Sequence, residues 1–171
     1  GVPHAAIKIE ITETGLMKDL LGVIPTLHRL NAIGVEVSID DFGTGYSSLA
    51  YLTTMPISEL KIDRSFVKEL GKQPKSAAVT SAIMALARSL RLRVVAEGVE
   101  TAAQMEALHR LGCTVMQGFL FSKALPGAQI EEWLQQVMLP RKAPWIVTAG
   151  GFEAIDIAAV EPSLGVPARA A

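Results

Sequence analysis

Val35-Glu36-Val37-Ser38-Ile39-Asp40-Asp41-Phe42-Gly43-Thr44-Gly45 is the stretch that decides the fold of this 171-residue chain. Apolar and polar side chains alternate up to Asp40, which is typical of a β-strand because successive strand side chains point to opposite faces. Of the two adjacent acids, only Asp40 can share the face of Glu36. Gly43 and Gly45 then allow a tight loop beside a charged ligand. The plainer interpretation is an acidic strand end followed by a flexible loop.

Four other strand-like runs lie around positions 7–12, 60–63, 94–97 and 115–117. Each of them also ends in a polar residue, in the same alternating pattern along the strand. Between the runs, stretches such as 16–33 and 77–90 carry apolar residues three and four positions apart, which is a helical spacing. Alternating strands and helices predict an α/β fold with a mainly parallel sheet. The polar residues that such a sheet gathers at the C-terminal ends of its strands are Glu10, Asp40, Lys61, Glu97 and Gln117. In a (β/α) barrel this end carries the chemistry.

The acids of this group offer only hard oxygen ligands, which favour Mg²⁺ or Mn²⁺ over zinc. They are Glu10, Asp40, Asp41 and Glu97. Carboxylates this close repel one another unless cations lie between them. Divalent ions near one another suit phosphodiester hydrolysis, since they polarise phosphoryl oxygens and lower the pKa of a bound water. Lys61 could hold that water or neutralise charge on phosphorus; its alternative role is a buried ion pair with Asp40 or Asp63.

Five motifs carry a resemblance to a known family. They are Ile-Glu-Ile-Thr-Glu-Thr at 9–14, Ile-Asp-Asp-Phe-Gly-Thr-Gly at 39–45, Leu-Lys-Ile-Asp-Arg-Ser-Phe at 60–66, Val-Ala-Glu-Gly-Val-Glu-Thr at 95–101 and Met-Gln-Gly-Phe-Leu-Phe-Ser-Lys at 116–123. In order and spacing they resemble the EAL domain, the bacterial phosphodiesterase module that hydrolyses cyclic di-GMP to the linear dinucleotide pGpG. Ala124 departs from the family, which usually has Pro there.

The resemblance implies a partial TIM-like (β/α) barrel with about five strands and intervening helices, against about eight strands in a closed barrel. In the family fold one strand runs against the others. The Glu-Ala-Leu strand and the next strand, which carries a metal-binding Asn in the family, are expected upstream of Gly1. Residues 1–139 are therefore predicted to be the C-terminal part of an EAL domain, followed by an irregular Ala/Pro-containing tail at 140–171.

The resemblance also implies a role for each candidate residue. The implied metal ligands are Glu10, Asp40, Asp41 and Glu97, holding Mg²⁺ or Mn²⁺, with two ions in the complete domain. The implied catalytic residues are Lys61, Glu97 and Gln117, of which the lysine interacts with the nucleophilic water. The implied supporting residues are Glu13, Asp63, Glu100, Gly43 and Gly45. Among these, Glu13 is expected to steady the loop at 42–49, which in the family couples substrate binding, metal binding and dimerisation.

The expected function is that of a cyclic di-GMP-specific phosphodiesterase in bacterial second-messenger signalling, with this truncated chain inactive by itself. Two alternatives are a non-catalytic cyclic di-GMP-binding or scaffold domain and a truncated product with neither activity. Cyclic di-GMP is the expected partner, the complete domain is expected to be a homodimer, and sensor or GGDEF-type domains are expected upstream.

The composition agrees with this expectation. A chain with 50% hydrophobic and 19% charged residues suits one domain or part of one. Its net charge of −1 means that the chain lacks the excess of basic residues typical of proteins that bind duplex nucleic acid. The single cysteine, Cys113, is expected to be a small buried residue in a reducing compartment. A cytoplasmic location follows, with membrane anchoring of the longer protein left open.

Overall fold

The computed structural model describes residues 1–45, 49–138, 146–148 and 151–153 of the chain. The chain divides into two units, residues 1–123 and residues 124–171. Among the described residues, no helix has both the length and the apolar character that crossing a bilayer requires. The candidate site residues all belong to the first unit.

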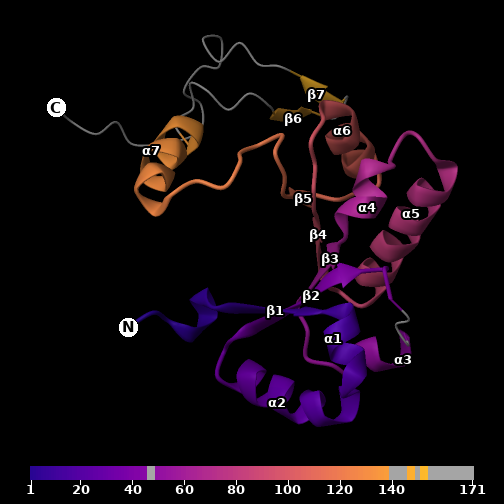
Figure 1. Cartoon of the computed structure of the whole chain (residues 1–171), viewed down its shortest axis with the longest axis vertical. Helices are drawn as coiled ribbons and strands as arrows, with labels where there is room; N and C mark the ends of the chain where they lie inside the picture. Colours follow the sequence, from indigo (N-terminus) through magenta and orange to yellow (C-terminus); the bar gives the residue numbers. More distant parts are fainter. Residues whose placement is uncertain (46–48, 139–145, 149–150, 154–171) are drawn as a thin grey trace. The chain divides into compact units, whose positions relative to one another are not determined.

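The first unit is built on a sheet of five parallel strands in the order β1-β2-β3-β4-β5 (Figure 1). The strands are β1 (Lys8–Thr12), β2 (Glu36–Phe42), β3 (Glu59–Ile62), β4 (Arg93–Ala96) and β5 (Val115–Met116). Each strand pairs with the next one along the chain, which is the arrangement that alternating strands and helices produce. The α/β class and the five strands predicted from the sequence are confirmed.

Helices connect consecutive strands of this unit. They are α1 (Glu13–Lys18) and α2 (Leu20–Ala32) after β1, α3 (Leu49–Leu52) after β2, α4 (Arg64–Lys68) and α5 (Pro74–Ser89) after β3, and α6 (Ala102–Arg110) after β4; a short 3-10 helix, η1 (His4–Ala6), precedes β1. The predicted helical stretch 16–33 is interrupted at Asp19, whose carboxylate accepts a hydrogen bond from the Gly22 amide at 3.1 Å. That bond caps α2 and separates it from α1.

One face of the sheet supplies the core of the unit. Ile39, Leu60 and Ile62 are at most 1% exposed. Helix α5 packs against β3 and β4, as Figure 1 shows, and α1 and α2 pack against β2. The alternation of side chains along each strand therefore sends the apolar residues towards the helices and the polar ones to the other face. Cys113 is buried, as predicted, and burial raises the pKa of its thiol.

At the amino-terminal end of the strands, the other face carries an ion-pair network that we call the amino-terminal charge layer: Lys8, Glu36, Glu59 and Arg93. Lys8 Nζ lies 2.7 Å from Glu59 Oε2 and 3.7 Å from Glu36 Oε2. Arg93 pairs with Glu36 and lies 3.6 Å from Glu59. Two cations face two carboxylates, so the layer is balanced in charge.

The second unit contains α7 (Gly127–Met138) and two short antiparallel strands, β6 (Ile146–Thr148) and β7 (Gly151–Glu153). The prediction of an irregular tail concerns mostly residues 140–145, 149–150 and 154–171, which lie outside the described residues.

Replacing Leu60 by alanine should lower the free energy of unfolding by about 2–5 kcal/mol, because it removes a fully buried side chain from a central strand. The matched control is Leu21→Ala, since Leu21 is 75% exposed on α2, and its effect should stay within about 0.5 kcal/mol. Urea unfolding followed by circular dichroism measures both. Equal losses in the two variants would show that β3 is not the core of this unit.

Candidate active site

A single ammonium group lies at the centre of the candidate site. The side chain of Lys61, on β3, is 7% exposed, and its Nζ lies 2.7 Å from Glu10 Oε2, 3.1 Å from Asp40 Oδ1 and 2.7 Å from Glu97 Oε1. The three acids come from β1, from β2 and from the residue that follows β4. The parallel register of these strands brings their C-terminal ends to one edge. The structure therefore brings together four of the side chains that the sequence places at this end.

The pKa of Lys61 reflects two opposing effects. Burial alone lowers it, but hydrogen bonds to the carboxylates of Glu10, Glu97 and Asp40 outweigh burial and hold it above the ordinary value of a lysine. The group is therefore a fixed positive charge at neutral pH and cannot ligate a metal. Of the two ion-pair partners that the sequence suggested for Lys61, the structure shows Asp40.

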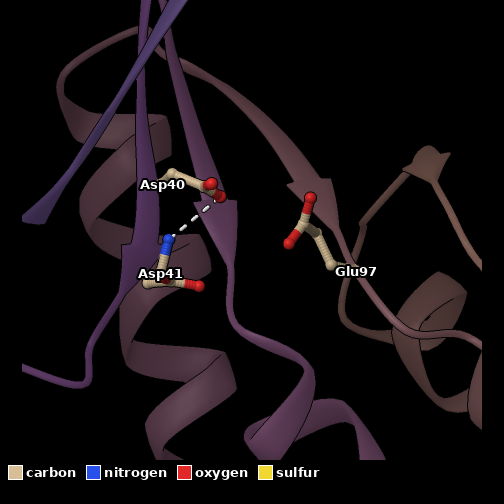
Figure 2. Close-up of side chains that lie close together, drawn as sticks. All are labelled: Asp40, Asp41 and Glu97. Atoms are coloured by element: carbon tan, nitrogen blue, oxygen red, sulfur yellow. Dashed lines mark hydrogen bonds between the residues drawn. The ribbon is translucent and has the colours of Figure 1, made fainter.

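Asp40, Asp41 and Glu97 form a group of carboxylates suited to a cation. Each offers an oxygen, and these oxygens all lie within 4.8 Å of one another. In Figure 2 the three side chains extend towards a shared space. Only hard oxygen ligands are present, so the donor set fits Mg²⁺ or Mn²⁺. Glu10 lies outside this group, and its Oε2 accepts a hydrogen bond from Lys61 Nζ at 2.7 Å.

The backbone at Asp41 explains how two adjacent acids reach the same space. Asp41 has a φ of 54°, in the left-handed region, which interrupts the strand alternation. Its amide donates to Asp40 Oδ1 at 3.1 Å, the bond drawn in Figure 2. Burial, followed by the nearby carboxylates of Asp40 and Asp63, raises the pKa of Asp41 above its usual value. A bound cation would relieve this repulsion.

Glu13 holds the loop that follows Asp41. It is the first residue of α1 and is 1% exposed. Its Oε2 accepts hydrogen bonds from the amides of Gly43 at 2.8 Å and Gly45 at 3.2 Å. Gly43 has a φ of 98°, and a Cβ on Gly45 would lie 3.1 Å from the Glu13 carboxyl carbon. Both glycines therefore let the loop backbone close over a buried carboxylate.

The structure places the remaining predicted residues in different ways. Asp63 caps α4 by accepting from the amide and hydroxyl of Ser65; burial raises the pKa of Asp63, but these hydrogen bonds outweigh it and lower the pKa. Gln117 is anchored through its backbone, which donates to Ala96 O at 2.8 Å. Glu100 is exposed, and its amide donates to Gln104 Oε1 at 2.8 Å. Asp63 therefore caps a helix and also lies beside Asp41, whereas Glu100 contributes through local structure.

A cavity of about 450 Å³ opens on the polar face of the sheet. Its lining includes Glu10, Lys61 and Gln117, together with Lys8 and Glu59 of the amino-terminal charge layer. The sequence analysis did not identify Lys8 and Glu59 as residues that line this cavity. The signal was available, because Lys8, Glu59 and the layer's other members each lie two or four residues before a candidate site residue and share its strand face.

Comparisons with known proteins agree with this geometry. The family model of the EAL domain matches residues 1–124. The bifunctional diguanylate cyclase/cyclic di-GMP phosphodiesterase MucR of Pseudomonas aeruginosa is 54% identical over 122 residues, which are 71% of this chain and 18% of that protein. The cyclic di-GMP phosphodiesterase NbdA of the same bacterium is 47% identical over 135 residues, 79% of this chain and 17% of that protein. The chain thus spans less than a fifth of these relatives.

Solved structures are similar as well. A MucR phosphodiesterase in complex with c-di-GMP superposes with a TM-score of 0.73 at 51% identity, covering 75% of this chain and 52% of that one. A manganese and cyclic di-GMP complex of Klebsiella pneumoniae BlrP1 gives a TM-score of 0.68 at 33% identity, covering 72% and 31%. The match over most of the chain, in sequence and in fold, shows that this chain belongs to the EAL domain family.

Proposed function

We propose that this chain is part of a cyclic di-GMP-specific phosphodiesterase domain that hydrolyses cyclic di-GMP to pGpG with Mg²⁺ or Mn²⁺. The observation that carries the proposal is the charge imbalance at the C-terminal ends of the strands. Four carboxylates, those of Glu10, Asp40, Asp41 and Glu97, face one ammonium. The amino-terminal charge layer of the same sheet is balanced, so the excess of acid is confined to the proposed site.

The relatives support the chemistry. The MucR structure contains c-di-GMP and the BlrP1 structure contains manganese with the same ligand. In this chain, Asp40, Asp41 and Glu97 would hold the divalent ions. When bound, such ions polarise a phosphoryl oxygen and lower the pKa of a bound water. Hydrolysis breaks one phosphorus–oxygen ester bond of the cyclic dinucleotide, and the oxygen of water takes its place on phosphorus.

The protein side chains have distinct parts in this step. Glu10 orients the ammonium of Lys61 through their 2.7 Å contact. Lys61 would hold the attacking water and offset the negative charge that develops on phosphorus. Gln117, at the rim of the cavity, can donate to or accept from the water or the substrate. Glu13 holds the loop after Asp41, so that the two adjacent acids keep their positions.

The setting of the domain is part of the same proposal. Cyclic di-GMP is the ligand, the complete domain acts as a homodimer, and sensor or GGDEF-type domains precede it in a cytoplasmic module. The name of MucR, which pairs a diguanylate cyclase with a phosphodiesterase, supports the presence of a further domain. Because the chain covers about half of the MucR structure, the experiments below use a protein that carries the complete domain around it.

Asp40→Asn should reduce turnover about a hundredfold or more, because it removes a charged ligand whose ions supply several kcal/mol of transition-state stabilisation. Affinity for Mn²⁺ should fall in parallel, and excess Mn²⁺ should restore part of the rate. The control is Glu106→Gln, which neutralises an exposed acid paired with Arg110 on α6. Formation of pGpG and equilibrium binding of Mn²⁺ are measured. Parental values for both in Asp40→Asn would refute the ligand assignment.

Lys61→Met should abolish turnover while leaving cyclic di-GMP binding measurable, because the lysine is proposed to act on the attacking water. Affinity for divalent ions should be retained, since the three carboxylates lose a competing cation. Titration with cyclic di-GMP in Ca²⁺, which replaces Mg²⁺ to suppress turnover, tests this. An unmodified protein that binds the dinucleotide in Mg²⁺ without cleaving it would favour the non-catalytic alternative.

Glu13→Ala should weaken both turnover and metal-dependent binding of cyclic di-GMP, because the loop amides of Gly43 and Gly45 lose their acceptor. Hydrogen exchange at these two amides should become faster, whereas Glu69→Ala, which alters a half-buried acid directly after α4, should leave it unchanged. Normal exchange and normal binding in Glu13→Ala would show that the loop is held by other contacts.

A further inference from the structure

Two glycines directly follow candidate site residues and lie against neighbouring backbone. Gly98 follows Glu97, has a φ of 68°, and would place a Cβ 2.6 Å from the Cβ and 3.4 Å from the Cα of Arg64. Gly118 follows Gln117 and would place a Cβ 2.2 Å from the oxygen and 2.3 Å from the nitrogen of Val99. Neither set of atoms can rotate away, because they belong to the backbone or are attached directly to it.

Hydrogen bonds fasten the same loops together beyond the ends of the strands. The Glu97 amide donates to Ile62 O at 3.1 Å, and the Gln117 amide donates to Ala96 O at 2.8 Å. Val99 then donates its amide to Gln117 O at 3.0 Å and accepts the amide of Leu120 at 2.9 Å. The segment after β4 therefore contacts both of its neighbours. Gly98 contacts Arg64, which follows β3, and Val99 contacts Gly118, which follows β5.

We propose that Gly98 and Gly118 are positioning residues of the site: by letting these three loops meet at their backbones, they set where Glu97 and Gln117 stand. The inference rests on the proposed function. Neither glycine has a side chain to offer a substrate. Gly118 contributes backbone to the lining of the cavity, and the effect proposed for both glycines is on where their neighbours stand. Glu97 is the residue affected most, because it lies beside Gly98 and two residues before Val99.

The distances set the scale of the effect. Ordinary van der Waals contact begins at 3.4 Å, so a methyl group at either glycine forces its neighbour away by about 1 Å. A shift of that size would break the 2.7 Å contact of Glu97 with Lys61 and separate Glu97 from Asp40 and Asp41. Misplacing a catalytic group by about 1 Å costs on the order of a hundredfold in rate.

Two glycines of the chain provide matched controls. Gly71 has a φ of 81°, close to that of Gly98, but a Cβ there has no neighbour within 4 Å. Gly71→Ala therefore imposes similar backbone strain without a collision. Gly127, at the start of α7, has open space around its Cβ and no left-handed φ, so Gly127→Ala is the control for Gly118→Ala.

The test measures equilibrium binding of Mn²⁺ by paramagnetic resonance, with kcat and KM for cyclic di-GMP, at a temperature where circular dichroism shows each variant folded. Gly98→Ala and Gly118→Ala should weaken Mn²⁺ binding about tenfold or more and lower kcat on the order of a hundredfold. Both controls should keep the parental Mn²⁺ affinity, although Gly71→Ala loses some stability. Parental Mn²⁺ affinity in folded Gly98→Ala and Gly118→Ala would overturn the inference while leaving the proposed function intact.

A compensating change keeps the test decisive if a single variant folds poorly. Arg64→Gly removes the Cβ that collides with residue 98, so adding it to Gly98→Ala should restore Mn²⁺ binding towards the parental value. Failure of this rescue, with Arg64→Gly alone binding normally, would overturn the steric argument. An unmodified protein that neither binds Mn²⁺ nor hydrolyses cyclic di-GMP would overturn the proposed function and this inference together.

Discussion

The contact on which the rest of the site depends is the ammonium of Lys61 shared among three carboxylates. Each carboxylate arrives from a different strand, so the three contacts hold only while β1, β2, β3 and β4 keep their register. Buried ion pairs are weak evidence for stability, because desolvation offsets much of the attraction. The geometry that these ion pairs require is strict, however. The arrangement of the site therefore depends on the order and register of the strands.

The two ends of the polar face behave differently although the same strands supply both. In the amino-terminal charge layer, every carboxylate has a cation of the protein within reach, so the layer is complete in itself. At the carboxyl-terminal end, Asp41 keeps a raised pKa and three carboxylate oxygens converge. A parallel sheet thus separates a charge-balanced set of residues from an acid-rich set by a spacing of two or four residues along each strand.

Much of the fold could be predicted from the sequence, because strand alternation and helical spacing are local patterns. The five strands and the gathering of Glu10, Asp40, Lys61 and Glu97 follow from that periodicity with the rule for parallel strands. Other features depend on contacts between distant segments: the partners of Glu59, and the approach of Gly118 to Val99. The break at Asp19 depends on a capping bond that competes with an otherwise continuous helical pattern.

The left-handed backbone at Asp41 restricts that position in addition to its charge. Glutamate would supply the same carboxylate, but among residues with side chains aspartate and asparagine are the ones that adopt this conformation at low cost. Asparagine lacks the charge. The acid that the proposed function needs and the left-handed turn are therefore met together by one amino acid, and a longer acidic side chain would have to distort the end of β2 to reach the same point.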